Sequence, residues 1–111
     1  MDLPIGNEGP LTGTTPVTIL AAPGASAQRI VPSNGAGVYN RDTVAHTITF
    51  QKNKGGTVRI LFRATGVSAG GVAILPKRVV LDATNESLEV LSDATATSTE
   101  PDFDVAALET T

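Results

Sequence analysis

The chain has 111 residues, of which 4% are aromatic and none is cysteine or tryptophan, and its formal net charge is −3. A chain of this length forms one small domain, and its core must be built from Val, Ile, Leu and Ala. The absence of cysteine excludes a disulfide framework and a thiolate metal site. No stretch approaches the about 20 apolar residues of a membrane span. The N-terminal residues also lack the basic and apolar regions of a secretory signal, so we expect synthesis in the cytoplasm.

The charges are distributed unevenly along the chain. All eight Lys and Arg residues lie between positions 29 and 78, whereas residues 79–111 contain eight acidic residues and no basic one. Such asymmetry can mark a nucleic-acid surface. The basic residues are scattered singly, with little aromatic interleaving, so nucleic-acid binding is disfavoured. We expect basic central strands to pair with acidic terminal segments, either within the chain or across a subunit boundary.

The first fifteen residues are rich in glycine and proline. This composition predicts an extended N-terminal arm over residues 1–15 without regular structure. The arm offers Leu3, Ile5 and Leu11 as apolar anchors for a partner. The alternative is a disordered tail.

From residue 16 onward, short apolar segments alternate with Gly and Pro turns at the spacing typical of a sandwich or barrel. No window shows the helical period of 3–4 residues. The predicted strands are 16–22, 27–32, 36–40, 44–52, 57–65, 71–75, 78–83 and 87–94. In the acidic C-terminal segment, 98–111, the alternation over 101–108 fits a last edge strand, and a short helix is the alternative.

These elements predict an all-β fold. We expect an antiparallel, jelly-roll-like β-sandwich of seven or eight short strands over residues 16–97, flanked by the extended arm and the acidic segment.

Residues 44–65 form a predicted β-hairpin. Its apolar faces are Val44, His46, Ile48 and Phe50 on one strand and Val58, Ile60, Phe62 and Ala64 on the other. Because both faces must lie on one side of the sheet, paired residues must have the same parity, and a two-residue loop would turn one strand over. We therefore expect a three-residue loop, 53–55, or its five-residue variant in the same register. It pairs Phe50 with Val58 and His46 with Phe62, and it gives Gly55 the left-handed position.

His46 is the single histidine of the chain. We expect a partly buried, neutral imidazole that is hydrogen-bonded to the backbone, to Asp42 or to Thr43. Catalysis would require a nucleophile and an orienting acid beside it. The chain has no G-x-S-x-G motif and no second histidine for a metal pair. The sequence therefore predicts no catalytic, cofactor or metal site, and the chain is not expected to be an enzyme.

Three other patterns are better explained without chemistry. Asp42 stands alone as an acid, so residues 40–43 form a turn rather than a calcium loop. The glycine-rich stretches 6–9 and 68–71 introduce no helix and match no phosphate loop. Glu89 and Asp93 fall on a predicted solvated strand face, and with Glu86 they give no sign of a glycosidase pair.

The order of the segments carries a family resemblance. A hydrophobic strand closed by a Pro-Gly turn is followed by a corner, a Gly-closed hairpin and the strand "LEVLSDAT". The corner consists of Asn40, Asp42, Thr43, His46 and Ile48. Over residues 15–97 the chain resembles small β-sandwich proteins of tailed-bacteriophage virions, in particular capsid decoration (cement or staple) proteins.

This resemblance implies a structural protein without cofactor or small-molecule substrate. Such a protein would bind the outside of an assembled capsid, clamp neighbouring major capsid proteins and reside on the virion exterior after synthesis in the host cytoplasm. We also expect a homo-oligomer, dimer or trimer, because a small sandwich leaves its edge strands open. The candidate partner-binding residues are Leu3, Ile5, Leu11, Lys52, Lys54, Arg59 and Arg63.

Two alternative functions remain open. One is a phage tail, fibre or adaptor β-domain. The other, from a different class, is a carbohydrate-binding module. The latter is disfavoured because sugar platforms usually expose aromatic rings, and the chain has no Trp and only one Tyr, Tyr39.

Overall fold

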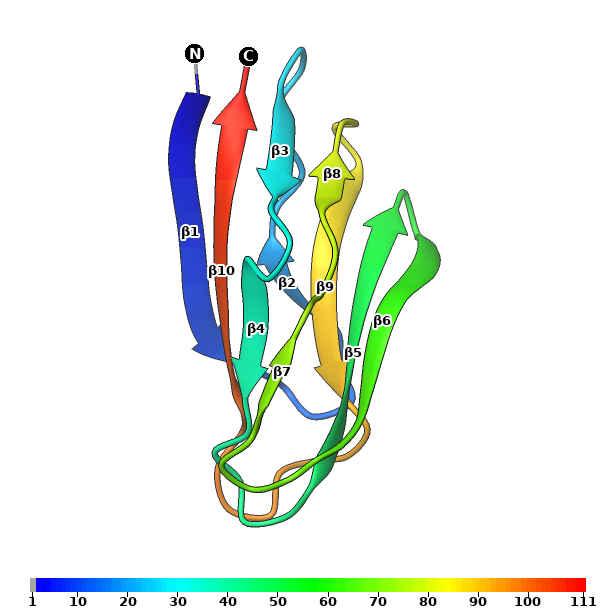
Figure 1. Cartoon of the computed structure of the whole chain (residues 1–111). Helices are drawn as coiled ribbons and strands as arrows, with labels where there is room; N and C mark the ends of the chain where they lie inside the picture. The colour runs from blue at the N-terminus through cyan, green and yellow to red at the C-terminus, as the bar shows by residue number, and fades with distance from the viewer. Residues whose placement is uncertain (1) are drawn as a thin grey trace.

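The computed structural model describes residues 2–111, so the first residue of the predicted arm lies outside the described residues. The described residues form ten β-strands in two antiparallel sheets and no helix (Figure 1). Nor does this part of the chain contain a helix long and apolar enough to cross a membrane. The strands are β1 (Asp2–Pro10), β2 (Val17–Leu20), β3 (Gln28–Val31), β4 (Ala36–Tyr39), β5 (His46–Lys54), β6 (Thr57–Val67), β7 (Val72–Ile74), β8 (Val79–Leu81), β9 (Glu86–Ser92) and β10 (Asp102–Thr110). The predicted all-β, jelly-roll-like sandwich is confirmed.

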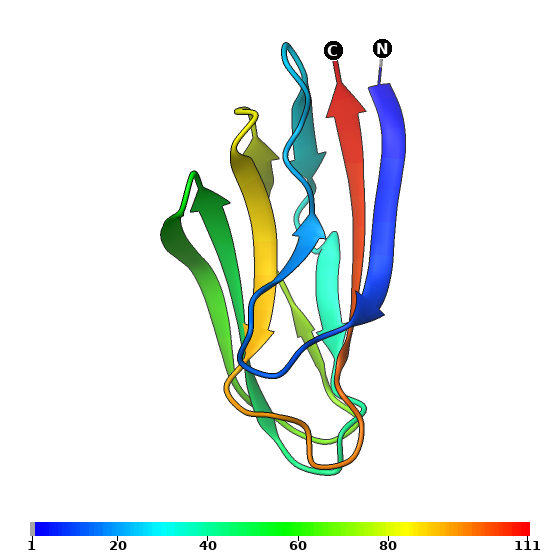
Figure 2. The ribbon, with the colours of Figure 1, turned by 180° about the vertical axis from the view of Figure 1, so that it is seen from behind.

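The six-stranded sheet is organised around β10. This strand pairs with β1 on one side and with β4 and β3 on the other, and β7 and β8 lie beyond β4 and β3. The four-stranded sheet has the order β2-β9-β5-β6. The two chain ends lie side by side at one end of the molecule, next to β1 and β10 on one side of it, and the β5–β6 hairpin forms the opposite side (Figures 1 and 2).

The core lies between the two sheets and is almost entirely aliphatic. Strand alternation explains its composition, because inward positions of β10 such as Phe103 and Val105 are buried while Asp104 between them is exposed. The largest fully buried hydrophobic side chains are Phe50, Leu11, Ile19, Ile48, Leu75, Leu81 and Leu88.

Strand β1 is regular, contrary to the expectation for a segment rich in Gly and Pro. It pairs with β10 from Asp2↔Thr110 to Pro10↔Asp102. The N–H of Ala106 donates to the Gly35 carbonyl at 2.8 Å, so the even-numbered groups of β10 face away from β1. By the antiparallel pattern, even-numbered groups of β1 then point to the free edge. Pro4 and Pro10 occupy such positions, where a missing N–H removes no ladder bond. The acidic strand β10 is accordingly an interior strand rather than an edge strand.

The register predicted for the β5–β6 hairpin is wrong. Its turn has two residues, Gly55 and Gly56, with φ of 59° and 95°, and Lys54 pairs with Thr57. Two successive positive φ values define the type I′ turn, which glycine adopts without strain. A β-bulge beyond Ile60 then shifts the register. The apolar side chains at the start of β5 and the end of β6 thus reach the same side of the sheet through a bulge, instead of through a loop with an odd number of residues.

The bulge decides which side chains of β6 face the core. Beyond it, Phe50 pairs with Phe62, and a second irregularity between Ile48 and His46 pairs His46 with Val67 instead of Phe62. Before it, Val58 and Ile60, which we expected on the inner face, lie on the outer face and are about half exposed.

We expect Leu11→Ala to lower the free energy of unfolding by about 2–5 kcal/mol, because Leu11 is only 2% exposed and belongs to the core. The matched control is Leu3→Ala, which removes the same atoms from a side chain that is 54% exposed and should change stability by less than about 0.5 kcal/mol. Urea denaturation of both variants measures the difference. Equal effects would contradict the assignment of Leu11 to the core.

Candidate functional site

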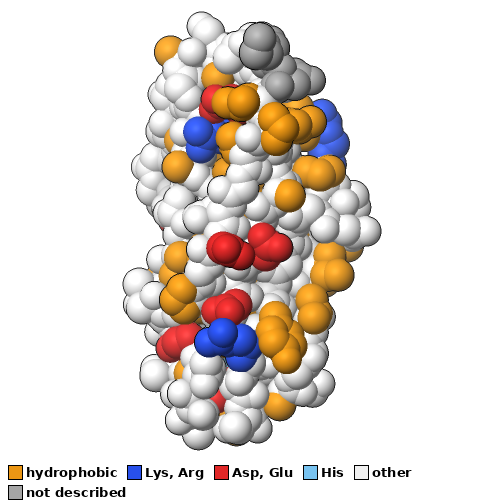
Figure 3. Space-filling view, turned by 90° about the vertical axis from the view of Figure 1, so that its left-hand side faces the viewer, with side chains coloured by type: hydrophobic (Ala, Val, Ile, Leu, Met, Phe, Trp, Pro, Cys, Tyr) orange, Lys and Arg blue, Asp and Glu red, His pale blue; other side chains and the backbone are white. Residues whose placement is uncertain are grey.

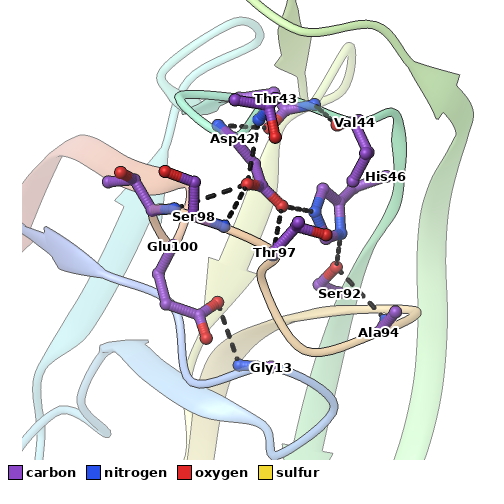
Figure 4. Close-up of polar contacts among 12 residues, drawn as sticks. Gly13, Asp42, Thr43, Val44, His46, Ser92, Ala94, Thr97, Ser98 and Glu100 are labelled. Atoms are coloured by element: carbon purple, nitrogen blue, oxygen red, sulfur yellow. Dashed lines mark hydrogen bonds and ion pairs between the residues drawn. The ribbon is translucent and has the colours of Figure 1, made fainter.

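A buried polar cluster surrounds His46, the first residue of β5 (Figure 4). Its Nε2 lies 2.6 Å from Asp42 Oδ2, and its Nδ1 lies 2.7 Å from Ser92 Oγ at the end of β9. All three residues are at most 3% exposed. Of the three partners expected for His46, the backbone, Asp42 or Thr43, the structure shows Asp42, and the imidazole is fully rather than partly buried.

Asp42 connects the cluster to the backbone of a distant loop. Its carboxylate accepts hydrogen bonds from the N–H groups of Thr97 and Ser98, both at 2.8 Å, and from Thr99 at 3.3 Å. These residues belong to the connection 93–101 between β9 and β10. One side chain therefore joins two loops that are more than fifty positions apart in the sequence.

Asn40 holds the Asp42 loop in place. Its amide donates to the carbonyls of Val44 at 2.9 Å and Val67 at 2.8 Å, while its Oδ1 accepts from the N–H of Asp42 at 3.0 Å. The side chain is fully buried. The predicted turn role of residues 40–43 is thus extended by a bond to the end of β6.

The surroundings keep Asp42 ionised. The hydrogen bond from His46 lowers the pKa of Asp42 far below its ordinary value, burial opposes this change, and the N–H groups of Thr97 and Ser98 reinforce it. Because a carboxylate only accepts hydrogen bonds, Nε2 of His46 carries the proton between the two groups. The cluster is therefore a buried anion with donors on every side.

Ser92, His46 and Asp42 are the residue types of a hydrolase triad, in hydrogen-bonding order. A nucleophile must reach its substrate, however, and Ser92 is as buried as the other two. None of the three lines the surface cleft or the hollow described below. The arrangement fastens loops, and all three side chains are withdrawn from the surface. Within residues 2–111, no group of three or more His, Asp or Glu side chains is placed to hold a metal ion.

Sequence reasoning missed Ser92, although a signal was present. Ser92 shares inward parity with Leu88 and Val90 in β9, as His46 does with Ile48 in β5. A lone polar residue at an inward position in each of two strands indicates a pair. The register Ile48↔Ser92, which only the folded sheet supplies, brings the two side chains together.

Three predicted basic residues gather at the open end of the sandwich. Lys52, Lys54 and Arg59 line a cleft of about 730 Å³ together with Lys77 and Glu86, which we call the basic cleft. Lys52 Nζ lies 3.1 Å from Glu86 Oε2. Burial raises the pKa of Glu86, but the hydrogen bonds from the Asp82 N–H and from Lys52 outweigh it, so the pKa is lowered overall.

The other candidate residues lie elsewhere. Arg63 is on the outer face of the four-stranded sheet, where its Nε donates to Thr49 Oγ1 at 3.3 Å. Leu3 is exposed, Ile5 is half-buried against the core, and Leu11 is buried, so Leu11 offers no surface to a partner.

Glu86 and Glu89 differ from the expectation of a solvated face. Both are buried, and Glu89 accepts hydrogen bonds from Gln51 Nε2 at 2.8 Å and Asn53 Nδ2 at 3.2 Å. The amide donors of the neighbouring strand compensate for the loss of water around the carboxylate.

An acidic hollow of about 540 Å³, not foreseen from the sequence, lies on the outer face of the six-stranded sheet. Its lining includes the apolar residues Tyr39, Val72 and Ile74 and the acidic residues Glu8, Asp102 and Asp104. Figure 3 looks onto this side of the molecule and shows acidic side chains grouped midway along it, beside hydrophobic ones.

Comparisons with known proteins show similarity in structure only. No protein-family model matches the chain, and no curated protein matches its sequence. The fold is similar to that of a chain of infectious bursal disease virus, Gx strain, with a TM-score of 0.54 and 13% identity over 98% of this chain and 32% of that one. A chain of the T13 particle of the same virus gives 0.55 and 11% identity, covering 97% and 30%. The nucleoplasmin-like N-terminal domain of Drosophila FKBP39 gives 0.49 and 10%, covering 100% and 92%.

The likeness to the two viral chains defines a class of fold. The chain spans about a third of the length of each of them. At these identities the likeness concerns the fold alone. The chain is an all-β sandwich whose fold is similar to that of these two viral chains.

We expect Asp42→Asn to lower the midpoint of thermal unfolding by about 10 °C or more, because the change removes the anion to which His46 and the N–H groups of residues 43, 97, 98 and 99 donate. Hydrogen exchange at the amides of Thr97 and Ser98 should accelerate in parallel. Asp104→Asn, at an exposed position, is the control and should change neither quantity. Unchanged exchange at Thr97 in Asp42→Asn would contradict the role of Asp42 as a fastener.

The lowered pKa of Asp42 also sets a pH dependence. The stabilisation by its carboxylate is complete above the usual aspartate pKa of about 4, and it is lost as the pH falls towards the lower pKa of the folded state. As the pH is lowered below about 4, we expect the midpoint temperature of thermal unfolding to decrease in the natural chain. The decrease should be smaller in Asp42→Asn. Parallel pH profiles for the two proteins would show that other groups cause the acid sensitivity.

Because Ser92 is buried, we expect a fluorophosphonate reagent to leave it unmodified in the folded chain. Mass spectrometry after incubation at neutral pH measures the modification, with an active serine hydrolase as the positive control. Modification of Ser92 would mean that the cluster opens to solvent and is able to react.

Proposed function

We propose that the chain is a structural virion protein that binds the outside of an assembled phage capsid and clamps neighbouring major capsid proteins. The observation that supports this most directly is the fold. Residues 2–111 form a helix-free sandwich similar to chains of an icosahedral virus, and the polar cluster around His46 is buried within it. A ligand that binds only the assembled lattice stabilises that lattice by mass action. Such a role requires a rigid surface and no active site.

The surface that we assign to the capsid is the first part of β1. Leu3 is exposed there, and Ile5 beside it is anchored on the core. Because β1 is paired along its length with β10, this surface is already ordered and loses little conformational entropy on binding. Weak contacts of this kind become strong when the symmetry of a capsid repeats them and neighbouring copies are linked.

A second candidate function, carbohydrate binding, is favoured by one observation. Tyr39 is about half exposed and lines the acidic hollow together with Glu8, Asp102 and Asp104. An exposed ring beside carboxylates can stack on a sugar and accept hydrogen bonds from its hydroxyls. A single tyrosine without any tryptophan makes this the weaker of the two proposals.

The test is to mix the purified chain with expanded, undecorated capsids of the virus that encodes it and to count bound copies by electron microscopy. We expect hundreds of symmetrically placed copies. A few copies at one vertex would instead support a tail, fibre or adaptor domain, and no bound copies would refute both virion roles. Binding to a glycan array without capsid binding would favour the carbohydrate module.

We expect Leu3→Glu to weaken capsid binding by about tenfold or more, as for an interface anchor. The matched control is Ser68→Glu, which adds the same charge at an exposed position of the connection between β6 and β7 and should bind normally. Deletion of residues 1–13 is unsuitable, because it would remove β1 and the core residue Leu11. Normal binding by Leu3→Glu would refute the assignment of this surface.

A further inference from the structure

Most of the basic side chains form no salt bridge within the described part of the chain. Among the described side chains, Arg29, Arg41 and Lys52 form salt bridges with Glu109, Asp102 and Glu86. The basic residues without a salt bridge to any described side chain are Lys54, Arg59, Arg63, Lys77 and Arg78. The predicted pairing of basic strands with acidic segments is therefore only partly satisfied within one copy.

The tip of the β5–β6 hairpin presents two different faces. Lys54 pairs with Thr57 and Lys52 with Arg59, so these basic side chains share the face that lines the basic cleft. Val58 and Ile60 lie on the other face, where each is about half exposed. Residues 54–60 are all exposed. The hairpin tip therefore has one cationic face, with Lys52, Lys54 and Arg59, and one apolar face, with Val58 and Ile60.

The acidic hollow also combines charged and apolar side chains, with charges opposite in sign to those of the hairpin tip. Two cross-strand rows lie on its face, one formed by Glu8, Asp104, Gly37 and Ile74 and the other by Pro10, Asp102, Tyr39 and Val72. The first row carries two carboxylates, Glu8 and Asp104, and ends in Ile74, whereas the second carries one, Asp102, which is paired with Arg41, and ends in Tyr39 and Val72. Gly37 leaves a gap between Asp104 and Ile74, because it has no side chain to fill the space above the sheet. The hollow has room for several side chains.

The free edges of the two sheets also favour the hairpin side. On β1, Pro4 and Pro10 lack N–H groups, and the N–H of Glu8 donates to Asn7 Oδ1 at 3.0 Å, so the edge is blunted against further pairing. Edge strand β6 contains no proline, so it keeps all of its backbone N–H donors. A partner is therefore more readily accepted along β6 than along β1.

We propose that the hairpin tip of one copy docks in the acidic hollow of a second copy. Lys54 and Arg59 then lie on Glu8 and Asp104, and Val58 and Ile60 pack on the apolar wall of Tyr39, Val72 and Ile74. The basic cleft and the acidic hollow share no residue, and the hairpin forms the margin opposite β1 and β10 (Figure 1). The contact joins two unlike surfaces, so it propagates from copy to copy. It goes beyond the proposed capsid binding and does not depend on it.

The test is a charge swap on the isolated chain, measured by sedimentation velocity without capsids. One variant carries Lys54→Glu and Arg59→Glu, and the other carries Glu8→Lys and Asp104→Lys. We expect the natural chain to self-associate. Each variant alone should have a dissociation constant at least about 100-fold higher, because like charges then face each other. An equimolar mixture of the two should recover association to within about tenfold of the natural chain, since each altered surface meets its complement.

The control variant is Arg78→Glu, which reverses a charge outside both linings and should associate normally. All substituted side chains are exposed, and circular dichroism checks that every variant is folded. A natural chain that stays monomeric up to its highest soluble concentration would overturn the proposal, as would a mixture that fails to associate. Sugar binding in the hollow that Glu8→Lys and Asp104→Lys abolish, without any self-association, would also overturn it.

Discussion

The fold depends on a single buried carboxylate. Asp42 accepts hydrogen bonds from His46 and from the backbone of Thr97 and Ser98, so it fixes the connection 93–101 that leads from the four-stranded sheet to β10. Strand β10 is in turn the common neighbour of β1, β3 and β4. The solvation of this one anion therefore contributes, together with the aliphatic core between the sheets, to the position of the six-stranded sheet relative to the other one. A buried charge without this set of donors would be strongly destabilising. Here the donors come from β5 and from the connection 93–101, so both segments must be in place before the charge is compensated.

Much of the architecture could be predicted because it follows from local patterns. Period-2 alternation identified β5, β6 and β9, and Pro and Gly marked their ends. The composition of residues 1–15 argued against a strand. That argument failed because Pro4 and Pro10 occupy edge positions that need no N–H, a condition set by the distant partner β10. The hairpin loop was likewise missed because a bulge beyond Ile60 can restore parity as well as an odd loop does. Nothing in the local sequence separates these two solutions.

The same distinction holds for the functional residues. His46 and Asp42 are four positions apart, and Asp42 was among the three partners expected for the imidazole. Ser92 and Thr97 reach the cluster through strand pairing and loop packing, which a single sequence does not specify. The acidic hollow was not foreseen either, because its two rows each combine residues of β1, β10, β4 and β7. Of the four predicted basic residues, Lys52, Lys54 and Arg59 meet in one cleft, and the bulge separates Arg63 from them.

The central position of β10 has a consequence for how the chain folds. The strand that three others need as a neighbour is the last of the ten in the sequence. Its pairing with β1 closes a loop that includes nearly every other residue, and contacts between such distant positions form slowly because their entropic cost precedes their reward. During synthesis, β1, β3 and β4 must therefore wait with open edges until β10 leaves the ribosome. The prolines of β1 and the charge of Arg29 in β3 protect the chain against aggregation during that interval.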